Sequence, residues 1–107
     1  MIEVTCYRNQ NRVTITGHAN SDRYGKDLIC AAVSALALTL SANVSHLADI
    51  GCVTDPVIKL SPGDGEISCV AVRDYRANVA NIFFAICVGF EILAERYPEF
   101  ISCRVEG

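Results

Sequence analysis

The sequence predicts an α/β fold of the α+β type, in which five strands form a mainly antiparallel sheet and two helices pack on it. Three observations lead to this prediction. Short segments with alternating apolar residues come in pairs joined by turn-forming residues, two long segments repeat apolar residues at helical spacing, and the segments follow the order ββαββαβ. Strands and helices in this order favour a sheet with helices packed on it.

The first two strands form a hairpin at the start of the chain. In residues 2–7 every second residue is apolar, which is the period of a half-buried strand. Residues 8–11 are polar and predict a turn, and residues 12–16 alternate again. We therefore expect two adjacent antiparallel strands.

The first helix is predicted from Asp27 to about Ile50, with Asp27 as its N-cap and Gly51 as the residue that ends it. One apolar stripe runs along this segment and consists of Ile29, Val33, Leu36, Leu40 and Leu47. A second stripe has small, weakly polar residues, namely Cys30, Ser34, Ala37, Ser41 and Ser45. Small residues allow another group to approach the helix closely.

The second half of the chain predicts another hairpin, another helix and a last strand. The turn sequence SPGDG predicts a second hairpin with strands at residues 57–60 and 66–72. Residues 76–97 carry apolar residues at helical spacing and predict a helix that ends before Pro98. Residues 100–105 alternate and predict the last strand.

Length and composition limit the classes of protein. We expect residues 1–107 to form one domain, because this length can bury a core without obligatory disulfides or metal. With 51% hydrophobic and 20% charged residues, the chain is not disordered and has enough apolar surface for an oligomer interface. The net charge of −3 and the scattered basic residues argue against a nucleic-acid partner.

No exported or membrane-spanning segment is predicted. The N-terminus MIEVTCYRNQ lacks the basic start, apolar stretch and cleavage site of a secretory signal. The longest apolar run, residues 28–40, is interrupted by Ser34 and Thr39 and falls short of the roughly 20 residues needed to span a bilayer. We therefore expect a cytoplasmic protein with no membrane partner.

The six cysteines lie inside apolar periodic segments, which suits small buried hydrophobes rather than three disulfides. They are Cys6, Cys30, Cys52, Cys69, Cys87 and Cys103. The chain has no CxxC pair and no cluster with metal-ligand spacing, so we expect neither a metal nor a cofactor. Five of the six are interpreted as packing residues, and Cys30 is the exception.

Cys30 and His18 have the chemistry of a catalytic pair. With Asp27 as the cap, Cys30 falls in the first helical turn, where free N–H groups and the helix dipole favour a thiolate. His18 follows a strand and a glycine, at the start of the loop that leads to Cys30. A histidine can deprotonate a thiol and later protonate a leaving amine. The pair therefore suffices for acyl transfer, including peptide hydrolysis, if N–H groups stabilise the oxyanion.

These residues also have ordinary structural interpretations. A cysteine in an apolar helix is more often packed than reactive, and a histidine at a strand end often only bonds its surroundings. His46 suits the last turn of a helix as a favourable charge. Asp22 either orients His18 or faces water. Ser34, one turn after Cys30, either reaches the site or bonds back to its own helix.

The sequence GHA at residues 17–19, followed by GKDLICAAVS at residues 25–34, resembles the signature of the ribosomal-processing cysteine proteases, the Prp or YsxB-like family. The resemblance covers nearly the whole chain, including its size and element order. The pattern GHA with G-x-D-[IL]-[VI]-C-A-x-[VI]-S is specific. Ile29 stands where valine is common, a change that leaves the chemistry untouched.

The resemblance implies a small cytoplasmic dimeric enzyme that removes the N-terminal extension of a large-subunit ribosomal protein. It places the nucleophile at Cys30, the base at His18, the motif aspartate at Asp27 and the motif serine at Ser34. The loop that would order around substrate consists of Ala19, Asn20, Ser21, Asp22, Arg23, Tyr24, Gly25 and Lys26.

Two other functions remain open on the residues alone. One is a non-enzymatic ribosome-assembly or protein-binding module, in which the thiol only packs and the loop holds a partner. The other is an acyl or thiol transferase that uses the same pair on a non-peptide substrate. Cleavage of the extended ribosomal protein would separate these functions from a protease.

Overall fold

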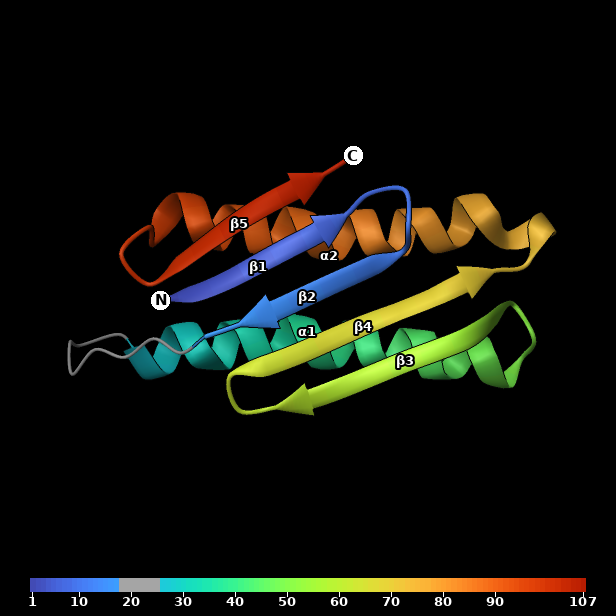
Figure 1. The fold of residues 1–107 in the computed structure, drawn as a ribbon, viewed down its shortest axis with the longest axis horizontal. Helices are drawn as coiled ribbons and strands as arrows, with labels where there is room; N and C mark the ends of the chain where they lie inside the picture. Colours follow the sequence, from blue (N-terminus) through green and yellow to red (C-terminus); the bar gives the residue numbers. More distant parts are fainter. Residues whose placement is uncertain (18–25) are drawn as a thin grey trace.

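Five strands form one sheet, and two helices cover one of its faces (Figure 1). The computed structural model describes residues 1–17 and 26–107. In chain order the elements are β1 (Ile2–Tyr7), β2 (Arg12–Thr16), α1 (Lys26–Asp49), β3 (Val53–Ser61), β4 (Asp64–Ala71), the 3₁₀ turn η1 (Arg73–Tyr75), α2 (Arg76–Arg96) and β5 (Ile101–Glu106). The predicted order ββαββαβ is confirmed.

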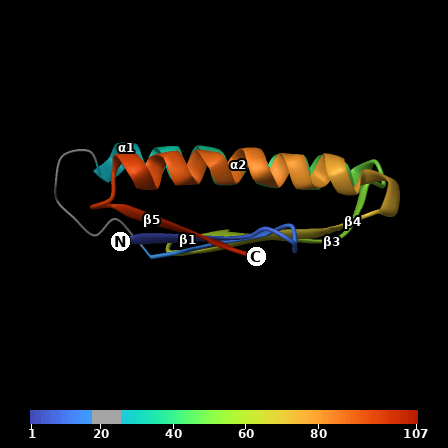
Figure 2. The same cartoon turned by 90° about the horizontal axis from the view of Figure 1, so that it is seen from above.

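The sheet is mainly antiparallel, as predicted. Its strand order is β3-β4-β2-β1-β5, with β3 and β5 at the two edges. β1 with β2, β2 with β4 and β3 with β4 are antiparallel pairs, whereas β1 and β5 are parallel. Each helix therefore connects two strands that run in the same direction, which places both helices on the same face of the sheet, as Figure 2 shows.

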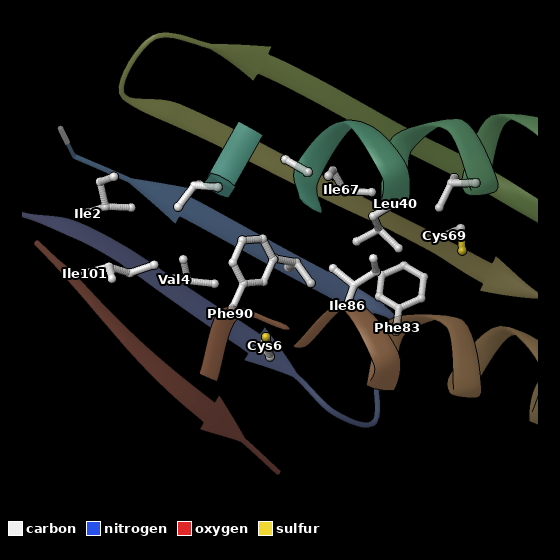
Figure 3. Packing of buried hydrophobic residues seen from close by; sticks show 14 of the residues in the cluster. Ile2, Val4, Cys6, Leu40, Ile67, Cys69, Phe83, Ile86, Phe90 and Ile101 are labelled. Carbon is white, nitrogen blue, oxygen red and sulfur yellow. The ribbon is translucent and has the colours of Figure 1, made fainter. Parts of the chain in front are cut away.

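The core lies between the sheet and the helices, where the strand and helix periods bring apolar residues face to face. The largest fully buried side chains include Phe90, Leu40, Ile67, Ile101 and Val4, which are labelled in Figure 3, and also Val13. Of the apolar stripe predicted on α1, Ile29, Val33 and Leu40 are buried, and the other two residues pack partly buried against the core. The stripe prediction is confirmed.

Several element boundaries differ from the sequence prediction, among them the starts of α1 and β3. α1 begins at Lys26, so Asp27 is its second residue and not its N-cap, and Lys26 belongs to the helix and not to the loop. A carboxylate suits the first turn as well as the cap, so residue type did not distinguish the two positions. β3 begins at Val53, before a bulge at which Asp55 has a positive φ of 51°, and this irregularity hides the alternation.

The structure joins Cys6 of β1 to Cys87 of α2 as a disulfide, with their Cα atoms 6.3 Å apart. The prediction that these two cysteines pack separately is therefore wrong. They are 81 positions apart in the sequence, and only the packing of α2 on the sheet brings them together. Cys30, Cys52, Cys69 and Cys103 are free.

Two apolar helices are longer than the apolar run of residues 28–40 from which no membrane-spanning segment was predicted. Residues 28–49 and 73–96 both form helices that are long and apolar enough to cross a bilayer, each with a mean hydropathy of 1.8. The same length and composition occur in core helices of soluble proteins, and both helices pack a buried stripe on the sheet. Their outer side still exposes large apolar residues, among them Leu28, Leu38, Phe84 and Ile92.

Candidate active site

Cys30 is the fifth residue of α1. It therefore lies one position after the first turn, where the sequence pattern predicted it. Side chains of a helix lean towards its N-terminus, so the thiol still points back towards the first turn and its unpaired N–H groups. Cys30 is free and only partly buried. The thiol is therefore accessible at the N-terminal end of the helix.

Cys30 lines a pocket of about 380 Å³ between α1 and the nearby end of the sheet. The α1 wall continues with Val33, Ser34, Ala37 and Leu38. The sheet contributes Ile2 of β1, Ile15 of β2 and the end of the β3–β4 hairpin, residues 60–65. Most of these side chains are apolar, so the pocket can hold an apolar group beside the thiol.

Gly17 connects this pocket to the segment that contains His18. It lines the pocket, and its N–H donates a hydrogen bond to the carbonyl oxygen of Gly63 in the β3–β4 turn, at 3.1 Å. Its φ is +84°, and a Cβ at this position would lie 2.2 Å from the carbonyl oxygen of Met1. Only glycine fits here, and it holds the chain against the pocket wall immediately before residue 18.

The other free thiols lie outside the pocket. Cys52 and Cys69 are buried, and burial raises the pKa of the Cys69 thiol. Burial, with the negative charge of Glu91 as a second cause, raises the pKa of the Cys103 thiol to about 11. In the part of the chain that the structure describes, Cys30 is the one free cysteine that lines the pocket.

The structure locates the remaining predicted site residues only in part. His18 and residues 19–25 lie outside the described residues, as does the side chain of Asp27. Ser34 is exposed and lines the pocket one turn after Cys30, on the same side of the helix. Back-bonding to the helix occurs at Ser41, whose hydroxyl donates to the carbonyl oxygen of Ala37 at 2.8 Å.

Sequence reasoning missed the pocket walls that come from the sheet. Leu60 and Gly65 were assigned to a hairpin, and Ile2 and Ile15 to strands, without any link to Cys30. The turn sequence SPGDG was the available signal, since it includes pocket residues, but nothing in the sequence places it beside α1. Tertiary packing alone brings these segments together.

The arrangement suits nucleophilic attack on an acyl group. An accessible thiol at a helix N-terminus faces an apolar pocket, and the first-turn N–H groups can stabilise negative charge on a carbonyl oxygen. Within residues 1–17 and 26–107, no three His, Cys, Asp or Glu side chains are grouped to hold a metal ion. The described residues thus include a candidate nucleophile and N–H groups that can stabilise negative charge beside it.

A comparison with protein families matches residues 1–102 to the cysteine protease Prp family. This match spans almost the entire chain and includes both motifs around residues 18 and 30. The chain belongs to the cysteine protease Prp family. It is therefore a cysteine protease, which decides against the non-enzymatic module that the residues alone left open.

Solved structures share the fold of this family member. The SMU.848 protein of Streptococcus mutans is 31% identical, with 99% of this chain and 94% of that chain covered and a TM-score of 0.75. Two structures of the ribosomal processing protease Prp from S. aureus, one with a substrate peptide and one with a covalently linked product peptide, are 21% and 22% identical. They cover 98% of this chain and 97% of that chain, with TM-scores of 0.69 and 0.68, and show the same fold. A search of curated proteins gave no match.

Proposed function

We propose that this protein is an endopeptidase that removes the N-terminal extension of a large-subunit ribosomal protein, with Cys30 as nucleophile and His18 as general base and acid. The observation that carries the proposal is the pocket itself. Among the described residues Cys30 is the free thiol that lines it, and Gly17, which precedes His18 in the sequence, lines the same pocket. Cys30, Ser34 and the residue that precedes His18 thus line one apolar pocket.

The reaction follows from these groups. The thiolate of Cys30, which forms at the start of α1 without requiring a base, attacks the carbonyl carbon of the scissile bond, and His18 carries a proton as imidazolium. The resulting oxyanion is stabilised by N–H groups at the start of α1. When the C–N bond breaks, the imidazolium of His18 protonates the leaving amine, which leaves a thioester on Cys30. Water, deprotonated by His18, then attacks the thioester and releases the carboxylate and the free thiol.

The substrate assignment rests on the structural neighbours. The S. aureus ribosomal processing protease carries a peptide in both structures, and in one of them the product peptide is covalently linked. A covalent product is the expected result of a thiol nucleophile. The extension of a ribosomal protein is a peptide of this kind, and its removal would take place in the cytoplasm.

Supporting roles belong to residues around the pair. Ser34 lines the pocket and offers a hydroxyl to the bound peptide. Asp27 lies in the first turn of α1, and we assign it a supporting role from its place in the motif. Residues 19–26 join the two catalytic residues, and we assign substrate binding to them.

We also propose that the protein is a homodimer that uses the outer side of its helices. Leu28 and Leu38 of α1 are 68% and 59% exposed, and Phe84 and Ile92 of α2 are 63% and 47% exposed. Both helices lie on the same face of the sheet, and nothing in the described part of the chain covers their outer side (Figure 2). Large apolar patches of this kind mark interaction sites. A second copy with the same patch would cover it.

The test of the proposed activity uses the extended ribosomal protein as substrate and mass spectrometry as readout. Cys30→Ala should abolish cleavage and keep the wild-type circular dichroism spectrum, because the reaction has no other nucleophile. Cys103→Ala is the matched control, since it removes a partly buried free thiol outside the pocket, and it should cleave normally. Cleavage by Cys30→Ala at the wild-type rate would disprove the assignment.

A further inference from the structure

The edge strand β3 leads directly to the pocket of Cys30. In the described part of the chain β3 pairs with β4 alone, so its other side carries unpaired backbone groups. Its last residues, Leu60 and Ser61, line the same pocket as Cys30. In Figure 1, β3 runs towards the end of the molecule at which α1 begins. A chain that lay along this edge would therefore reach the thiol.

The free edge is regular only in the half that is near the pocket. A bulge lies between Thr54 and Val57, and Pro56 within it has no N–H to donate. Bulges and prolines are the devices that protect edge strands from pairing with another chain. In β3 they lie in the far half, so residues 57–61 remain a regular edge beside the active site.

The side chains along this half offer an apolar surface on the helix-covered face. Ile58 pairs with the buried Ile67 and so lies on that face, yet it is 42% exposed. Leu60, two residues further on, is on the same face and is also 42% exposed. Lys59 alternates with them and points to the opposite face. The exposed side chains therefore suit alternate apolar residues of an extended peptide.

The register shows which backbone groups are free. The turn has two residues, and Ser61 and Asp64 close it as a hydrogen-bonded pair. Hydrogen-bonded and non-hydrogen-bonded pairs alternate along an antiparallel ladder, so Lys59 bonds to β4. The N–H and C=O groups of Ile58 and Leu60 then point outward, away from β4. Together they present two donors and two acceptors to an incoming strand.

We propose that the substrate peptide binds as an additional strand on the free edge of β3, along residues 57–61, and that this pairing directs the scissile bond to Cys30. The inference rests on the proposed function. An extended peptide fits better than a folded partner, because the regular edge is short and ends in the pocket. Strand addition supplies affinity through main-chain bonds, and alternate side chains supply specificity.

A scan of N-methylated peptides tests the pairing with the wild-type enzyme. The probe is a synthetic peptide that spans the junction of the ribosomal extension, methylated at one amide nitrogen at a time. Methylation at every second residue on one side of the scissile bond should lower kcat/KM about tenfold, because each removes one edge hydrogen bond. The intervening positions should change it less than about twofold, because their amides face away from β3. Equal effects at successive positions would overturn the inference.

A pair of variants tests the edge from the enzyme's side. Ile58→Pro removes both the side chain and the outward N–H, whereas Ile58→Ala removes only most of the side chain. We expect about a tenfold lower kcat/KM for Ile58→Pro than for Ile58→Ala, with the same rate of Cys30 alkylation by iodoacetamide in both. If the proline variant does not fold, the scan of N-methylated peptides still decides whether the substrate pairs with β3.

The outcomes separate this inference from the proposed function. Equal cleavage by the two folded variants would overturn the strand addition and leave the protease assignment intact. A sedimentation profile that changes from dimer to monomer only in Ile58→Pro would show that a second copy occupies the edge, which also overturns it. A wild-type enzyme that cleaves no extended ribosomal protein would overturn both proposals.

Discussion

Gly17→Ala should impair both folding and catalysis, and Gly51→Ala is its matched control. Both glycines have a positive φ, +84° and +80°, so an alanine at either position pays a left-handed backbone penalty of about 1–2 kcal/mol. At Gly51 the added Cβ meets nothing within 4 Å. At Gly17 it would lie 2.2 Å from the backbone oxygen of Met1, which forces the backbone to move.

The two variants should differ in how much folding stability they lose. Overpacking that shifts backbone costs about 1–3 kcal/mol, so Gly17→Ala should lose about 2–5 kcal/mol in total and Gly51→Ala about 1–2 kcal/mol. For a domain of this length, 1 kcal/mol corresponds to roughly 4–8 °C in Tm. The effect of the methyl group on the unfolded chain is common to both variants and cancels in the comparison.

The two variants should also differ in catalytic activity. Gly17 precedes His18 and bonds to Gly63 on the pocket wall, so a shifted Gly17 displaces the base. A misplacement of about 1 Å can cost about a hundredfold in rate, and we expect a loss of that order in kcat/KM for Gly17→Ala but not for Gly51→Ala.

The assays are thermal unfolding, cleavage of the extended ribosomal protein and alkylation of Cys30 by iodoacetamide. The alkylation rate should stay within about twofold of wild type in both variants, because the thiol itself does not depend on residue 17. Equal Tm losses in the two variants, or normal cleavage by a folded Gly17→Ala, would refute the reasoning.

Three further predictions concern His18, the proposed dimer interface and the partly buried thiol of Cys103. His18→Ala should keep the alkylation of Cys30 near the wild-type rate but lower peptide cleavage by about 10²–10⁴, because the leaving amine loses its acid; normal cleavage would make this histidine structural. Phe84→Glu should convert the dimer to a monomer in sedimentation, whereas the exposed Ser102→Glu on β5 should not; a monomeric wild type at micromolar concentration would contradict the interface. Folding raises the pKa of the Cys103 thiol from 9.0 to about 11, so the folded state keeps a proton that the unfolded state loses, and the free energy of unfolding should fall as pH rises through this range. Cys103→Ala should reduce this decrease in the free energy of unfolding. An unchanged pH dependence in this variant would contradict the raised pKa of the Cys103 thiol.

The sequence by itself determined the elements and the candidate nucleophile. Periods of two and of about 3.6 residues are local properties, so the strands, the helices and their order followed from residues that are neighbours in the chain. Cys30 could be selected for the same reason, because a cysteine near a helix N-terminus after a polar loop is a local pattern. The part of β3 around the bulge at Asp55 was not predicted, because the bulge interrupts the alternation on which a strand prediction depends.

Only the tertiary structure decided what surrounds Cys30. The pocket combines Ile2, Leu60 and Cys30, which lie in three elements that are far apart in the sequence, and the disulfide joins Cys6 to Cys87 across 81 positions. Apolar periodicity shows which side of an element is buried but not which other element covers it. The sheet order β3-β4-β2-β1-β5 sets those contacts, because it places the free edge of β3 and the turn after it beside the start of α1.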